Sequence, residues 1–128
     1  MARRPPPRGR LHPLKVSDGF RAFVLDQLGE LGEVEPRPMF GGVGLYHGGL
    51  FFGIVAADVL YLKVDERTRR DYVAAGMPPF KPYAHRPVTM HYYAVPPVVL
   101  ESPNELASWA KKAVDVAARA AGTTGRNS

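Results

Sequence analysis

The chain has 128 residues, of which 45% are hydrophobic, enough for one domain with a buried core. The absence of cysteine excludes a disulfide framework and thiolate metal sites. No run approaches the roughly 20 apolar residues that span a membrane. Prolines follow the first arginines where an export signal would need an apolar segment. We therefore expect a soluble cytoplasmic protein.

The net charge of +5 belongs to the N-terminus. Five of the 17 lysines and arginines lie in residues 1–15, which hold no acid, so 12 cations and 12 acids remain in the rest of the chain. These five cations are Arg3, Arg4, Arg8, Arg10 and Lys15. We expect residues 1–16 to form a disordered basic arm, rich in proline and arginine. This arm serves either as a solubilising tail or as an electrostatic contact to nucleic acid.

A first helix is predicted after Ser17, whose side chain can cap it. Its apolar residues recur with helical spacing along one stripe: Phe20, Phe23, Val24, Leu28 and Leu31. We expect Gly32 to end this helix. Pro36 and Pro38 should keep the following link extended, because the residue before a proline disfavours helical backbone.

The stretch from residue 39 to residue 64 predicts three antiparallel strands, near 39–46, 49–57 and 59–64, separated by glycine and aspartate turns. Neighbouring strand residues point to opposite faces, so alternate residues define two faces. The aliphatic set, expected to face the core, is Val43, Leu45, Leu50, Phe52, Ile54, Ala56, Leu60, Leu62 and Val64. The other set is mixed and aromatic.

After these strands, Asp65 and Glu66 place negative charge where it suits the start of a second helix, which Gly76 should end. The prolines near residues 80–83 favour a loop or an edge strand over a central strand. Residues 88–95 alternate apolar and polar side chains and predict a further strand.

The last helix has the clearest start signal in the sequence. Ser102 and Glu105 form a capping box around a proline at the first helical position. An apolar stripe that includes Trp109 follows, and we expect the helix to close at Gly122. Trp109 should pack onto the sheet.

The predicted order is α-β-β-β-α-β-β-α, which implies a two-layer α+β domain, an antiparallel β-sheet with helices on one face. The folded domain should span residues 17–121, and residues 122–128 should form a disordered tail.

The second face of this sheet has nothing obvious to cover it. Its predicted residues are Tyr46, Phe51, Val55, Tyr61, Lys63, His91 and Tyr93. Aromatic side chains with polar tips are typical of interfaces. We therefore predict a protein contact there, most simply a symmetric homodimer. The alternatives are a solvated face, or cover by the basic arm or the proline-rich loop.

The sequence carries no recognisable catalytic, metal or cofactor site. Residues 41–44 resemble a phosphate-binding loop, but strand follows them instead of helix, so tight backbone packing or a bulge explains the glycines better. His85 and His91 lack a known metal-ligand spacing, and no nucleophile and base are paired. We expect a protein that is not an enzyme and binds no cofactor.

Four blocks of the sequence together are similar to the TfoX/Sxy N-terminal domain family. They are RPMFGGVGLY from Arg37, LYLKVD from Leu60, AAGMPPF from Ala74 and TMHYYAVP from Thr89, and the resemblance covers roughly residues 18–119. It implies a secretion-chaperone-like α+β domain with no assigned catalytic residues.

The founding members of this family regulate natural competence for DNA uptake and act on transcription together with the cyclic-AMP receptor protein. They carry a second, C-terminal helical domain, whereas this sequence ends just after its last predicted helix, so we expect a stand-alone domain. The resemblance thus implies a non-enzymatic regulatory or protein-interaction module, whose protein partner belongs to the transcription machinery. Non-specific nucleic-acid binding through the basic arm is the second hypothesis, and a small-molecule binder or enzyme using the mixed face is the third.

The arm hypothesis makes a quantitative prediction. With five cations, the slope of log affinity against log salt on duplex DNA should be no steeper than about −4.5. Deleting residues 1–15 should abolish DNA binding and leave the melting temperature unchanged, as measured by fluorescence anisotropy and thermal unfolding. Binding that survives the deletion would place the nucleic-acid site in the folded domain instead.

Overall fold

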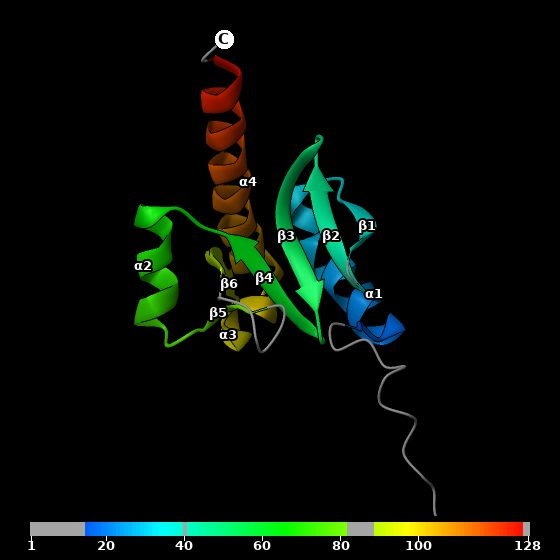
Figure 1. The fold of residues 1–128 in the computed structure, drawn as a ribbon. Coiled ribbons are helices and arrows are strands. Elements are labelled where there is room, and N and C mark those ends of the chain that lie inside the picture. Colours follow the sequence, from blue (N-terminus) through cyan, green and yellow to red (C-terminus); the bar gives the residue numbers. More distant parts are fainter. Residues whose placement is uncertain (1–14, 40, 82–88, 127–128) are drawn as a thin grey trace, which may run out of the picture.

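The computed structural model describes residues 15–39, 41–81 and 89–126. Within these ranges the chain forms one antiparallel sheet of six strands, in the spatial order β1-β2-β3-β4-β6-β5 (Figure 1). The strands are β1 (Glu35–Met39), β2 (Gly42–His47), β3 (Leu50–Ala56), β4 (Val59–Lys63), β5 (Pro79–Phe80) and β6 (Thr89–Ala94). The helices are α1 (Asp18–Gln27), the 3-10 helix η2 (Leu28–Leu31), α2 (Glu66–Ala74), α3 (Pro97–Leu100) and α4 (Pro103–Arg126).

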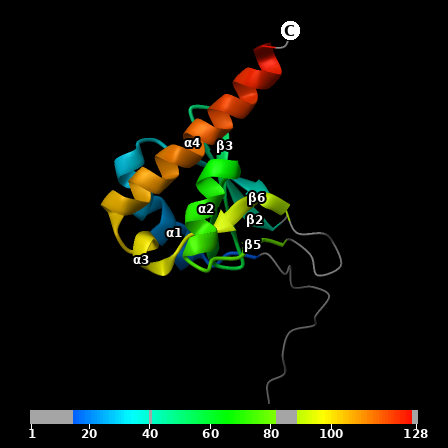
Figure 2. The ribbon, with the colours of Figure 1, turned by 90° about the vertical axis from the view of Figure 1, so that its left-hand side faces the viewer.

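Helices α1, α3 and α4 lie together on one side of the sheet, and no helix of the described ranges crosses the other side (Figures 1 and 2). Helix α4 is the longest and packs against β3, β4 and η2. Helix α2 stands beside the sheet and contacts β6. The predicted α+β fold, an antiparallel sheet with helices on one face, is confirmed.

The structure adds two elements to the predicted order. The link containing Pro36 and Pro38 pairs with β2 and becomes β1, an edge strand. An edge strand tolerates proline because the N–H groups on its outer side need no partner in the sheet. The other addition is α3, a single turn with Pro97 at its first position.

Glycine ends two of the helices as predicted but not the third. Gly32 and Gly76 follow their helices with φ angles of 115° and 76°, which side chains rarely adopt. Helix α4 continues through Gly122 to Arg126, so the predicted stop there is wrong. Gly122 does not adopt a positive φ. A glycine that keeps helical backbone only weakens a helix, by about 1 kcal/mol relative to alanine.

Hydrogen bonds from two side chains fix the start of α1. The Ser17 hydroxyl accepts from the backbone N–H of Phe20 at 3.2 Å, which is the predicted cap. The Ser17 N–H donates to Asp58 Oδ1 at 2.8 Å, which ties α1 to the β3–β4 turn. Ala57 and Asp58 form that turn with φ angles of 51° and 58°, the left-handed backbone that a tight hairpin requires.

The main core lies between the sheet and the helices. Its largest fully buried side chains are Phe52, Leu28, Leu45, Leu60, Leu62, Leu106, Val24 and Val55. Trp109 is partly buried, and its ring meets that of Tyr72 edge-on with the centroids 4.8 Å apart, so it joins α4 to α2. Phe23 was expected on the apolar stripe, but 39% of its surface is exposed, and its ring lies 6.2 Å from that of Phe20.

Because of a β-bulge between β2 and β3, several side chains of β3 lie on the opposite face of the sheet from the one predicted. Leu45 pairs with Gly53 and Tyr46 pairs with Phe51, so Phe52 is an extra residue without an opposite partner. Strict alternation predicted Ile54 and Ala56 on the core face. Both instead belong to a second cluster on the opposite face, while Val55 enters the main core.

The core makes a direct stability prediction. Leu106→Ala should lower the free energy of unfolding by about 2–5 kcal/mol, because Leu106 is fully buried between α4 and the sheet and its removal leaves a cavity. Ser108→Ala, exposed on the same helix, should change it by less than about 0.5 kcal/mol. Urea unfolding of both variants measures the difference. Equal stabilities would mean that α4 is not docked as described.

Candidate functional site

The sheet face opposite the helices carries a continuous row of rings and charges. The Tyr46 and Phe51 rings stack with centroids 5.1 Å apart, and Phe51 meets Tyr92 at 5.6 Å. The Arg37 guanidinium lies 4.3 Å from the centre of the Tyr46 ring, and Lys63 Nζ lies 5.0 Å from that of Tyr92. We call these five residues the aromatic row. It crosses the sheet from β1 to β6 and has a cation at each end.

Glycine on β2 makes room for this row. A Cβ at Gly44 would lie 3.1 Å from the Met39 methyl group and 3.2 Å from the Phe51 ring. These are tighter than ordinary contacts, so a Cβ at position 44 would force the neighbouring side chains to shift by a few tenths of an ångström. Gly44 therefore has a packing role, which the sequence favoured over phosphate binding for this glycine-rich segment.

A second group of apolar side chains continues the same face beside the row. Tyr61 and Phe80 pack with ring centroids 4.8 Å apart. They lie in the cluster that also holds Ile54, Ala56, Tyr92, Met39 and Phe51. The exposed side of this cluster is formed by half-buried Tyr61, Phe51 and Met39. This sheet face is therefore apolar and aromatic over most of its described width.

Burial changes the pKa values of Lys63, Tyr61 and Tyr92 on this face. It lowers the pKa of Lys63 from its ordinary value and raises that of Tyr61. Burial is also the main cause that raises the pKa of Tyr92 to about 12. Lys63 Nζ donates to the Tyr92 hydroxyl at 3.4 Å. At neutral pH the tyrosines are uncharged hydrogen-bonding groups, not bases.

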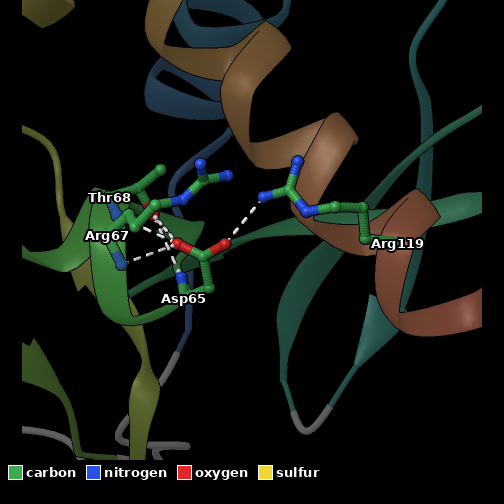
Figure 3. Close-up of polar contacts among 4 residues, drawn as sticks. All are labelled: Asp65, Arg67, Thr68 and Arg119. Carbon is green, nitrogen blue, oxygen red and sulfur yellow. Dashed lines mark hydrogen bonds and ion pairs between the residues drawn. The ribbon is translucent and has the colours of Figure 1, made fainter. Parts of the chain in front are cut away.

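A second candidate surface is a groove beside Asp65, between α2 and α4. Asp65 caps α2: its Oδ1 accepts from the N–H groups of Arg67 and Thr68 at 3.0 and 2.9 Å (Figure 3). The Thr68 hydroxyl accepts from the Asp65 N–H at 3.0 Å, which completes a capping box. Across the groove, Arg119 of α4 donates to Asp65 Oδ2 at 2.7 Å.

These contacts make Asp65 a clamp between two helices. The hydrogen bond from the Thr68 backbone, followed by the contacts from Arg119, lowers the pKa of Asp65 to about 2. The adjoining hollow, of about 650 Å³, has an apolar floor of Val64, Val116 and Ala120. Its rim mixes both signs of charge in Lys63, Asp65, Glu66, Arg69, His91 and Arg119. Asp65 is thus engaged in structural contacts and is not held as an acid or base near neutral pH.

Comparison with known proteins adds one match. The pattern of the TfoX N-terminal domain matches residues 26–117, most of the chain. This chain belongs to the TfoX N-terminal domain family. No curated protein matches it. The match includes every described strand and the helices from η2 through most of α4, so the aromatic row and Asp65 lie within the matched region, while Arg119 lies two residues beyond it.

The TfoX domain holds four of the seven predicted interface residues on the open face: Tyr46, Phe51, Tyr61 and Lys63. Val55 and Tyr93 are misplaced in the prediction, because both are buried in the main core, Val55 through the bulge and Tyr93 through its pairing with Leu62. His91 shares the alternation of Tyr93, not of Tyr92, and lines the groove beside Asp65. The interface role itself stays a prediction.

The residues of this face that sequence reasoning missed include Arg37, Phe80 and Tyr92, besides Ile54, Ala56 and Met39. Alternation along β6 places Tyr92 and Tyr93 on opposite faces of the sheet. The sequence does not show which of the two faces the helices, so the prediction chose the wrong one. Arg37 was hidden because its segment was predicted to be a link.

The predicted N-terminal arm of this chain lies almost entirely outside the described residues. This holds for Arg3, Arg4, Arg8 and Arg10, while Lys15 is described and exposed. Among the described residues, no three metal-ligating side chains converge. No helix within the described ranges has the length and apolar character needed to cross a membrane.

The clamp predicts a pH-dependent stability. Asp65→Ala should lower the free energy of unfolding by about 1–2 kcal/mol at pH 7, through loss of the cap and of the Arg119 contact. Asp65→Asn should cost less, because an amide oxygen still caps the helix.

The sign of the pH dependence follows from the depressed pKa. The charged Asp65 stabilises the fold above its ordinary pKa of 3.8, and this contribution is lost as the pH falls toward about 2. The stability difference between the parent and Asp65→Asn should therefore shrink on acidification below about pH 4. Urea unfolding at a series of pH values measures it. A difference that does not change with pH would show that the charge of Asp65 contributes nothing.

Proposed function

We propose that this TfoX N-terminal domain is a non-enzymatic regulatory module that works by binding another protein on its open sheet face. The observation that supports this most is the aromatic row, a set of rings already packed in a fixed arrangement on a face that no described helix covers. Apolar faces of this kind are uncommon on monomeric proteins, and aromatic side chains and arginine are enriched where proteins meet.

The fixed arrangement of the rings favours binding. Tyr46 is held between Arg37 and Phe51, and Tyr92 between Phe51 and Lys63. Side chains that are already ordered lose little conformational entropy when a partner docks. Gly44 beneath the row helps to keep it in place, since Met39, Tyr46 and Phe51 all close over it.

The same contacts favour protein over single-stranded nucleic acid as the occupant. Nucleobases bind a sheet by stacking on exposed ring faces. On Tyr46 both ring faces are in use, one by Arg37 and the other by Phe51. Tyr92 is buried and Tyr46 and Phe51 are half-buried, so little ring surface is left for a base to stack on.

The edge strands of the sheet are poorly suited to bind a partner, which favours the open face as the binding surface. A peptide can extend a sheet only where the edge strand offers free N–H and C=O groups. The edge strand β1 contains Pro36 and Pro38, and the other edge, β5, is two residues long and begins with Pro79. Proline and short edge strands both oppose the addition of a further strand.

The family membership supports a regulatory role for such contacts. We propose that the module acts in the control of transcription, as expected from its resemblance to competence regulators, and that its partner is a protein, most simply a second copy of the chain. Neither of the two surfaces described above requires a reaction to explain its residues, since the row is packed ring against ring and Asp65 serves as a cap.

Site-specific photo-crosslinking tests the proposed function. A photoreactive amino acid at Tyr61, half-buried on the open face, should give a discrete protein adduct that Phe51→Glu removes. The matched control is the same amino acid at Lys111, exposed on α4 on the helix side. If position 61 gives no more protein adduct than position 111, or gives nucleic-acid adducts instead, the proposal is wrong.

A further inference from the structure

We propose that Lys63 is the attachment point of a covalent ligand, and that its amine forms a reversible imine with a small aldehyde that carries a carboxylate and lies in the hollow beside Asp65. This ligand site is separate from the proposed contact with a protein on the open face, and neither depends on the other.

Lys63 differs from the other lysines of the chain in its surroundings. Of the five lysines, Lys63 alone is half-buried. The four exposed ones are Lys15, Lys81, Lys111 and Lys112. Lys63 Nζ lies 5.0 Å from the centre of the Tyr92 ring and 3.4 Å from its hydroxyl oxygen, and both of these groups are uncharged. No described carboxylate forms an ion pair with this amine.

These surroundings favour the neutral amine. Burial lowers the pKa of Lys63 from its ordinary value, and no described ion pair opposes this effect. Only a neutral amine has the lone pair that attacks a carbonyl carbon, and lysines that form imines are often activated by desolvation. Lys63 should therefore react at a lower pH than the exposed lysines.

The hollow beside Asp65 gives a small molecule access to Lys63, whose side chain forms part of its wall. Its volume of about 650 Å³ is within the range of small-molecule sites, and its apolar floor suits the body of an aromatic or short aliphatic compound. The other ionisable side chains of its rim are Asp65, Glu66, Arg69, His91 and Arg119.

The two carboxylates of this rim are already engaged by other groups. Asp65 accepts from the start of its own helix and from Arg119, and Glu66 forms an ion pair with Arg69 at 2.7 Å. Arg119 reaches Asp65 through Nη2, and a guanidinium has five N–H donors, so Arg119 can also donate to a carboxylate in the hollow. Because both side chains line one hollow, a ligand held by Arg119 can present its carbonyl group to Lys63.

The covalent step is a condensation of the amine with the aldehyde. Nζ attacks the carbonyl carbon, and the carbonyl oxygen leaves as water with the two hydrogens of the amine, so a C=N bond replaces the C=O bond. No oxidant, reductant or further reactant takes part, and hydrolysis reverses the step. The adduct would replace the amine at one end of the aromatic row by a larger, anionic group.

Reductive trapping on the full chain tests this reactivity. The protein is treated with para-carboxybenzaldehyde and cyanoborohydride near neutral pH, and peptide mass spectrometry gives the rate of adduct formation at each lysine. Lys63 should be labelled roughly fivefold or more faster than Lys111, because desolvation and a bound aldehyde both favour it. This excess should disappear in urea and shrink at alkaline pH, where the exposed lysines also lose their protons. Equal labelling of Lys63 and Lys111 in the folded protein would overturn the proposal.

A second measurement tests the carboxylate of the ligand. Benzaldehyde lacks this group, so the ratio of labelling at Lys63 to labelling at Lys111 should be lower with benzaldehyde than with the anionic aldehyde. Arg119→Gln should reduce the ratio for the anionic aldehyde to the benzaldehyde value. Its benzaldehyde ratio should stay unchanged, which also shows that the variant is folded.

Arg70→Gln is the matched control, because Arg70 is exposed on α2 and does not line the hollow. This variant should change neither ratio. Equal ratios for the two aldehydes in the parent would contradict the anionic class of ligand. A loss of the anionic preference in Arg70→Gln as large as that in Arg119→Gln would contradict the place assigned to the carboxylate.

Discussion

The β-bulge between β2 and β3 decides which side chains of the central strand reach each face. Phe52 is the extra residue, and it allows Phe52 and Val55 to enter the main core while Phe51 and Ile54 lie on the open face. Without it, simple alternation would put Phe52 and Ile54 on one face. The bulge therefore supplies a ring to both layers: Phe52 fills the space beneath α4, and Phe51 becomes the centre of the aromatic row.

The two faces of the sheet have different physical roles as a result. The helix side is closed: apolar side chains are fully buried there, and hydrogen bonds and ion pairs such as Asp65 to Arg119 hold the helices to each other. On the opposite side the rings pack against one another along the sheet and no described helix lies over them. Ile54, Ala56, Phe80 and Tyr92 are buried there, and Tyr46, Phe51 and Tyr61 are half-buried. An ordered apolar surface of this kind is suited to recognition, because little entropy is lost when it is covered.

Membership of the TfoX N-terminal domain family fits this division. The matched region contains both the described strands of the sheet and the surface for which a binding role is proposed. The blocks of sequence that carry the resemblance include Arg37, Gly44, Tyr46, Lys63 and Tyr92, which are the residues that build or support the aromatic row. These blocks therefore contain residues of the open face as well as residues of the core.

The sequence alone determined the fold class, the family and most element positions, because these depend on local signals. Ser17, Asp65 and Ser102 mark helix starts by hydrogen bonds within a few residues, and apolar periodicity marks the strands. Tertiary structure decided the rest. The bulge at Phe52, the entry of Tyr93 rather than Tyr92 into the main core, and the pairing of residues 35–39 as an edge strand all depend on which strand lies alongside, and the chain's own periodicity does not encode that choice.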